Sequence, residues 1–171
     1  EGEDTELDKT VVENIGDPLV HMIRNSLDHG VESVEERKEK GKNEEAFVSL
    51  KAYYKAGNVI IDVEDDGKGL DKDVIFSKAV ERGVAKENGE YTEQEIFQFI
   101  FEPGFSTADK ISKISGRGVG LDVVKTMIDK LNRTVNVTSV KGKGTTFSIR
   151  LPLTLAIIQG LLVRVGKEIY S

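Results

Sequence analysis

The apolar positions near the start of the chain follow a helical period. They are spaced three or four residues apart: Val12, Ile15, Leu19, Ile23 and Leu27. This spacing predicts an amphipathic helix. Pro18 falls inside the pattern, so we expect either one long helix or two segments bent near that proline. The helix is expected to end at Gly30, because glycine is common where helices stop.

Alternating apolar and polar positions predict two hairpins. The β-branched and aromatic runs within residues 46–66 are separated by Gly57-Asn58, and the runs at 134–140 and 145–153 are joined by KGKG. Helical spacing and capping residues predict helices at 71–82, 93–101 and 121–131, with Asp71 and Thr92 as N-caps. The charged residues 32–45 indicate a solvated helix or loop. Together these elements favour an α+β fold, with helices on a mostly antiparallel sheet.

Composition narrows the class of protein. The 171 residues fit one domain of ordinary size, and the absence of cysteine excludes disulfides and thiolate metal sites. No apolar run is long enough to cross a bilayer, and the first ten residues are acidic where a secretory signal would be basic. The net charge of -6, without a concentrated basic face, argues against nucleic acid as the main partner. We therefore expect a cytoplasmic protein without a transmembrane segment.

Both histidines of the chain lie in the stretch HMIRNSLDHG, residues 21–30. Because each helical residue advances by about 100°, His21, Asn25, Asp28 and His29 are expected to share one face. Such a face is either simply solvated or turned toward a binding cleft. A zinc pair is disfavoured by the spacing, whereas an asparagine carbonyl suits a magnesium ion held partly by substrate phosphates. The apolar residues assigned to the opposite, packed side are Leu19, Val20, Ile23 and Leu27.

Three glycine-containing motifs are candidates for ligand contact. Asp65-x-Gly67-x-Gly69 follows a predicted strand; it is either a turn or a site where a carboxylate accepts a hydrogen bond from an amino group such as that of adenine. The stretch SGRGVGLDVVK opens a helix and can present backbone N–H groups to phosphates, but it lacks the GK[ST] ending of a Walker A loop. GKGTTF predicts a hairpin turn, with Thr145 and Thr146 available as phosphate or water ligands. The unpatterned residues 102–120 between these motifs indicate a functional loop or lid.

The order of these motifs resembles the N, G1, F, G2 and G3 boxes of the GHKL nucleotide-binding superfamily. Within it, DPLVHMIRNSLDHG, FEPGFST, SGRGVGLDVVK and LPLTLAI are similar to the ATP-binding catalytic domain of the CheA family of bacterial chemotaxis histidine kinases. The resemblance implies a two-layer α/β sandwich, the Bergerat fold, over residues 1–151. Residues 152–171 are then expected to be a connector and the truncated start of a following CheW-like regulatory domain; the alternative is a final helix and strand of the same domain.

The resemblance also implies roles for individual residues. Asn25 would bind magnesium, and His21 would sit by the γ-phosphate as a base or orienting group. Asp65 would take the adenine amino group, with Gly67 and Gly69 opening room beside the base. The other residues expected to contact the nucleotide are His29, Lys78, Ser106, Gly116, Gly118, Gly120, Leu121 and Thr146.

The resemblance implies a kinase that needs a separate acceptor. Mg-ATP would donate its γ-phosphoryl group in trans to a histidine on a phosphotransfer domain, since both histidines here belong to the ATP site. The implied partners in a full protein are a dimerisation domain, a CheW-like adaptor and chemoreceptors. The alternatives are a GHKL ATPase of the gyrase B, MutL or chaperone kind, disfavoured because those use a glutamate where His21 stands, and a module that senses nucleotide without chemistry.

Overall fold

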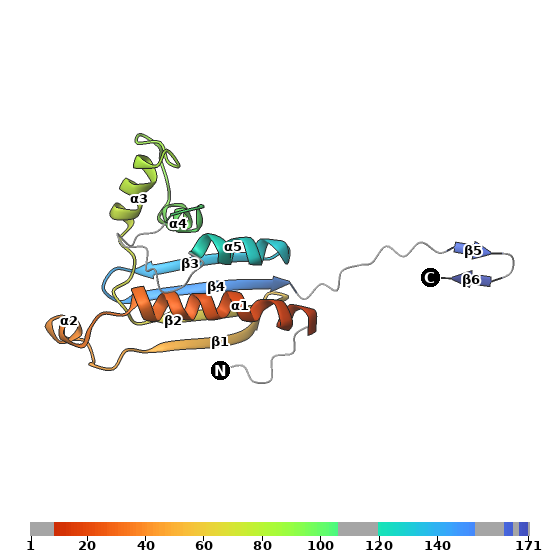
Figure 1. The fold of residues 1–171 in the computed structure, drawn as a ribbon, viewed down its shortest axis with the longest axis horizontal. Coiled ribbons are helices and arrows are strands. Elements are labelled where there is room, and N and C mark those ends of the chain that lie inside the picture. The colour runs from red at the N-terminus through yellow and green to blue at the C-terminus, as the bar shows by residue number, and fades with distance from the viewer. Residues whose placement is uncertain (1–8, 106–119, 153–162, 166–167, 171) are drawn as a thin grey trace.

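The computed structural model of this chain describes residues 9–105, 120–152, 163–165 and 168–170 (Figure 1). The helices are α1 (Lys9–Asn25) with a π-helical turn η1 (Ser26–Gly30), α2 (Val34–Glu39), α3 (Lys72–Glu81), α4 (Glu93–Gln98) with a 3₁₀ turn η2 (Phe99–Phe101), and α5 (Leu121–Lys130). The strands are β1 (Val48–Lys55), β2 (Asn58–Asp65), β3 (Thr134–Val140), β4 (Gly144–Pro152), β5 (Val163–Val165) and β6 (Glu168–Tyr170).

The main sheet has the strand order β1-β2-β4-β3, and all three pairings are antiparallel. β1–β2 and β3–β4 are the two predicted hairpins, and β2 pairs with β4 to join them. The register places Asp65, the last residue of β2, opposite Thr145 near the start of β4. The open end of the β1–β2 hairpin and the turn of the β3–β4 hairpin therefore lie at the same end of the sheet. β5 and β6 form a separate two-stranded antiparallel sheet.

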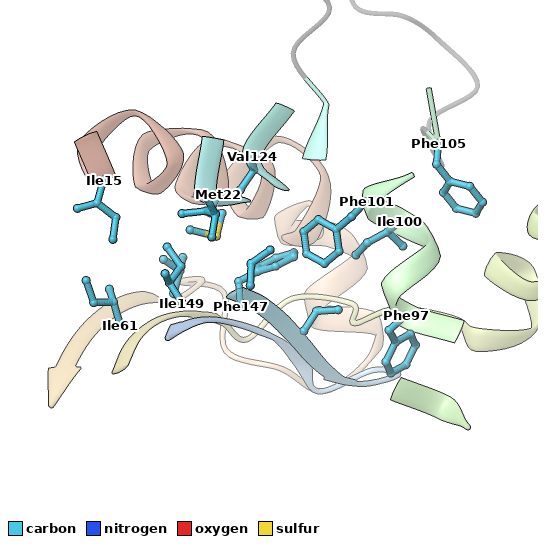
Figure 2. Close-up of a cluster of buried hydrophobic side chains, with 14 of the residues drawn as sticks. Ile15, Met22, Ile61, Phe97, Ile100, Phe101, Phe105, Val124, Phe147 and Ile149 are labelled. Atoms are coloured by element: carbon cyan, nitrogen blue, oxygen red, sulfur yellow. The ribbon is translucent and has the colours of Figure 1, made fainter. Parts of the chain in front are cut away.

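The core lies between this sheet and a layer of helices. Figure 2 shows Met22 of α1 and Val124 of α5 on the helix side of the core and Ile149 of β4 on the sheet side. All three side chains are fully buried. α1 and α5 pack against each other, and α5 also contacts β3. The expected α+β fold, a two-layer sandwich, is confirmed.

α1 is one uninterrupted helix with Pro18 buried inside it, so the alternative of two segments is not observed. The assignment of Val20 and Leu27 to the packed side is wrong, because their side chains are 54% and 57% exposed. The buried stripe is centred on Met22, and Val20 lies about 160° around the helix from it. Leu19 and Ile23 flank the stripe and are partly buried.

The helix predictions at 71–82, 93–101 and 121–131 are confirmed within a few residues. Asp71 caps α3 by accepting hydrogen bonds from two backbone amides, and Thr92 forms a capping box with Glu95 at α4. The description of residues 32–45 as solvated is wrong at Glu32 and Arg37, which are buried. No helix in the described ranges is long and apolar enough to cross a membrane.

Candidate nucleotide-binding site

Asp65 ends β2 as a buried carboxylate, with 4% of the residue exposed. Its Oδ2 accepts a hydrogen bond from the Ser26 hydroxyl at 2.8 Å, and its Oδ1 accepts one from the Gly67 amide at 3.0 Å. An ionised carboxylate has about four acceptor positions, so Asp65 keeps acceptor capacity for a further donor. Ser26 was missed from the sequence; its position four residues after Met22, on the buried stripe of α1, was the available signal.

The loop after Asp65 passes against the end of η1. The Lys68 amide donates to the Gly30 carbonyl at 2.8 Å, and a Cβ on Gly67 would lie 2.1 Å from that same oxygen. Gly69 has φ +68°, and a Cβ there would lie 2.3 Å from the Val140 carbonyl. Both positions thus require glycine because neighbouring protein backbone approaches them closely. These backbone contacts explain the glycines without any need for space beside a bound base.

The β3–β4 turn closes the other side of this loop. The Ser139 hydroxyl accepts from the Leu70 amide and donates to the Gly144 carbonyl, both at 2.8 Å, and lies 3.0 Å from the Thr145 hydroxyl. Thr145 is buried, whereas Thr146 points to the opposite face of β4, where it pairs with Glu64. The threonine opposite Asp65 is thus Thr145. The expected contact of Thr146 with the nucleotide stays a prediction.

The polar residues of α1 lie next to the buried carboxylate. Asn25 directly precedes Ser26, and His21 is one turn earlier; both are half-buried, while His29 in η1 is exposed. Among the described residues, no hydrogen bond or ion pair engages the side chain of any of these three. The π-helical turn is closed by the Val31 amide donating to the Ser26 carbonyl at 2.9 Å, and π turns in helices often mark functional sites.

The remaining candidate residues are spread over α3, α5 and undescribed segments. Gly120 caps α5 and Leu121 begins it, which puts both on a helix that packs beside α1. Lys78 lies in α3, which packs on α4 and η2. Ser106, Gly116, Gly118 and the rest of residues 106–119 of the expected lid lie outside the described residues.

The described start of the expected lid, residues 102–105, is anchored at both backbone groups of Gly104. Arg82 donates to its carbonyl, and its amide donates to Asp122 Oδ2 at 3.3 Å in the first turn of α5. The Arg82 guanidinium also lies 5.4 Å from the centroid of the buried Phe105 ring, so Phe105 is a second point at which this segment is held.

A charge network centred on the buried Arg37 and Glu32 lies behind the Asp65 loop. The Arg37 guanidinium is 1% exposed and binds both carboxylate oxygens of Asp66, at 3.2 and 2.7 Å. Lys42 donates to both oxygens of Glu32 and to the carbonyls of Asp66 and Gly67.

The network lowers the pKa values of its two carboxyl groups. Burial alone would raise the pKa of Asp66, but the hydrogen bond from Arg37 holds it below normal. Burial would likewise raise the pKa of Glu32, but the hydrogen bonds from Lys42 and Lys40 hold it below normal. The pKa of Arg37 is raised by its bond to Asp66.

These lowered pKa values predict acid sensitivity. A carboxyl whose pKa is depressed in the folded state contributes stability above its ordinary pKa, 4.5 for Glu32 and 3.8 for Asp66, and loses it as the pH falls through the lowered value. We expect the free energy of unfolding, measured with urea, to decrease as the pH falls below about 5. Asp66→Asn should be less stable at neutral pH and less sensitive to acid. Parallel pH curves for the two proteins would contradict this linkage.

The described residues include no group of three or more histidine, aspartate or glutamate side chains placed to hold a metal ion. Asn25 is the candidate ligand at this end of α1, and its amide oxygen is of the type that magnesium prefers.

Comparison with known proteins decides the family. Residues 14–155 match the family described as Histidine kinase-, DNA gyrase B-, and HSP90-like ATPase. The chain belongs to this ATPase family. The match covers the whole main sheet and its helix layer from Asn14 onward, so the buried carboxylate, the glycine loop and the polar face of α1 all lie within the ATPase domain.

Individual relatives are similar over the full length of the chain. The chain is 57% identical over 171 residues to the chemotaxis protein CheA of Treponema pallidum, and 55% identical over 172 residues to that of Bacillus subtilis. These alignments cover 100% and 99% of this chain, but only 21% and 26% of the relatives. A solved blue-light activated histidine kinase of Erythrobacter litoralis is 19% identical with a TM-score of 0.48, over 86% of this chain and 32% of that one.

Proposed function

We propose that this ATPase-family domain is the ATP-binding catalytic domain of a chemotaxis histidine kinase. The carrying observation is the buried Asp65 carboxylate at the end of β2, fixed by Ser26 and Gly67 and set beside the polar face of α1. The remaining acceptor capacity of Asp65 suits the adenine amino group. The half-buried Asn25 and His21, on the adjoining helix, are then available to the phosphates.

The residues of α1 suit a triphosphate with magnesium. Asn25 would hold the ion through its amide oxygen, while phosphate oxygens and water complete the coordination. When bound, the ion neutralises charge on the β- and γ-phosphates. Asn25 thus orients the phosphates, and Gly120 and Leu121 bring the N-terminus of α5, with its backbone N–H groups, to the same side of the core.

His21 is the candidate for proton handling. It is half-buried one turn before Asn25, and its ring has no partner among the described residues. In the transfer, the bond between the γ-phosphorus and the ADP oxygen breaks, and a bond to a nitrogen of the acceptor histidine forms. His21 would hold or accept the proton that the acceptor imidazole carries. The acceptor comes in trans, from a separate phosphotransfer domain.

The surroundings of the domain follow from the same proposal. A full protein would contain a dimerisation domain as well. It would work in the cytoplasm with a CheW-like adaptor and chemoreceptors as its partners. Residues 152–171 would begin a CheW-like regulatory domain. Two observations support this: β5 and β6 pair with each other in a sheet of their own, and the ATPase family match ends at residue 155.

Transfer of labelled phosphate tests the proposal. With γ-labelled ATP and magnesium alone, the chain should remain unlabelled, and an added phosphotransfer domain should become labelled slowly because no scaffold holds the two together. We expect His21→Gln to lower this transfer at least about a hundredfold, within the usual range for loss of a general acid or base, while ATP affinity by calorimetry changes little.

Each arm of this experiment has an opposing result. Stable label on the isolated chain would exclude the trans acceptor, and normal transfer by His21→Gln would remove the role given to that residue. Release of inorganic phosphate at an equal rate without an acceptor would instead assign an ATPase of the gyrase B kind. Omitting magnesium should abolish the transfer.

A further inference from the structure

We propose that Lys42, supported by Arg37 and Glu32, is a positioning residue for base recognition. Its ammonium group fixes two successive peptide units of the loop after Asp65, and so fixes the direction in which that carboxylate presents its free acceptor. This inference rests on the proposed ATP site. The charge network lies behind the loop, on residues that the resemblance does not assign to the nucleotide.

The first peptide unit joins Asp66 to Gly67. Its carbonyl oxygen accepts from Lys42 Nζ at 2.9 Å and from Arg37 Nη1 at 3.3 Å. A trans peptide is planar, so its N–H points away from its C=O. The N–H of this unit, on Gly67, donates to Asp65 Oδ1 at 3.0 Å. The two cations bind the carbonyl edge of this planar unit and so hold its N–H, on the opposite edge, toward the carboxylate.

The next peptide unit, from Gly67 to Lys68, is held in the same way. Its carbonyl accepts from Lys42 Nζ at 2.6 Å, and its N–H donates to the Gly30 carbonyl at 2.8 Å. One ammonium group thus orients both peptide planes. The Gly67 N–H then points toward Asp65, and the Lys68 N–H points toward Gly30 at the end of η1. Charge-assisted hydrogen bonds of this kind are roughly twice as strong as neutral ones.

The ammonium group is itself fixed from behind. Both oxygens of the buried Glu32 accept from Lys42, at 3.1 and 3.3 Å, and Glu32 also lies 3.5 Å from Arg37 Nη1. Arg37 in turn donates to the carbonyls of Asn43 and Glu45, at 2.6 and 3.2 Å, which ties the chain between α2 and β1 to the loop. These bonds hold the Lys42 ammonium group in one place. Removing it therefore deprives the Asp66 and Gly67 carbonyls of a fixed donor.

The test compares ATP with inosine triphosphate, which has the same sugar and phosphates but a carbonyl in place of the amino group. Lys42→Met keeps the apolar stem and removes the donors. We expect this variant to lower the preference for ATP over inosine triphosphate about tenfold, because the preference depends on a correctly aimed charged acceptor. A lysine that only stabilised the fold would weaken both nucleotides alike and leave their ratio unchanged.

Lys40→Met is the matched control. Lys40 also donates to Glu32, at 3.2 Å, but its side chain is 49% exposed and makes no hydrogen bond to the loop among the described residues. Its removal should leave the preference as in the unaltered chain. An unchanged preference in folded Lys42→Met would overturn the positioning role. If the unaltered chain itself shows no preference for ATP, the proposed function fails instead.

Hydrogen exchange in the unaltered, nucleotide-free chain keeps the inference testable if Lys42→Met does not fold. The Gly67 and Lys68 amides should both be protected, since the two peptide planes are held before any ligand binds. Exchange of either amide at the rate of an unstructured peptide would overturn the inference.

Discussion

Asp65→Asn is expected to weaken ATP binding about a hundredfold, because a charged and buried acceptor is lost. The substituted amide has one acceptor oxygen, while Ser26 and Gly67 already present two donors to this side chain. Its NH₂ group would also face the adenine amino group donor to donor. Isothermal titration calorimetry at a temperature where circular dichroism shows a folded chain gives the measurement.

Asp62→Asn is the control for this substitution. Asp62 lies on the same strand, β2, but on the face of the sheet away from the helices, where its Oδ2 accepts from the Tyr53 hydroxyl at 2.9 Å. ATP affinity should therefore be unchanged in this variant. Equal affinities for Asp65→Asn and the unaltered chain would refute the base-recognition role of Asp65.

Gly67→Ala is expected to lower the free energy of unfolding by about 3 kcal/mol and to remove measurable ATP binding. The added Cβ would lie 2.1 Å from the Gly30 carbonyl and 2.9 Å from Asp65 Oδ1. The contact with Gly30 is to a backbone oxygen, which cannot rotate away as a side chain could. The loop must therefore move away from η1, and this movement displaces the hydrogen bond from the Gly67 amide to Asp65. Urea denaturation and calorimetry measure the two effects.

Gly16→Ala in α1 is the matched control, because a Cβ there meets nothing within 4 Å. Replacing glycine by alanine inside a helix should raise stability by about 0.5–1 kcal/mol, with ATP affinity unchanged. A Gly67→Ala variant that is as stable as Gly16→Ala would show that the loop is not packed against η1 as described.

The elements of the fold were predictable because their signals are local. The β-branched alternation around Gly57-Asn58 and the helical spacing of residues 121–131 each depend on neighbours in sequence. The packed side of α1 was assigned less well. The apolar side chains of Val20 and Leu27 suggested a packed side that the fold leaves exposed, and the central position of Met22 becomes evident only when the sheet and α5 cover α1.

The polar contacts of the site depend on pairs that are distant in sequence. Asp65 was predicted as a ligand-binding carboxylate, but its partner Ser26 is an ordinary helical serine until β2 passes beside it. The cluster of charged residues at 32–45 predicted a solvated segment. Only the folded chain shows that Arg37 within it is buried and donates to backbone carbonyls. Thr145 and Thr146 were both candidates from the sequence, and the register of β2 with β4 shows that Thr145 is the one opposite Asp65.

The distance between these partners along the chain has a consequence during protein synthesis. Ser26 precedes Asp65 by 39 residues, whereas Ser139 follows Leu70 by 69. Contacts of such separation cannot form until the later segment has left the ribosome, since chains are made from the N-terminus and domains fold as units. A nascent chain that ends before β4 has α1 but lacks the β3–β4 turn that packs against the Asp65 loop. If the proposed function holds, nucleotide binding would therefore begin only after β4 has left the ribosome.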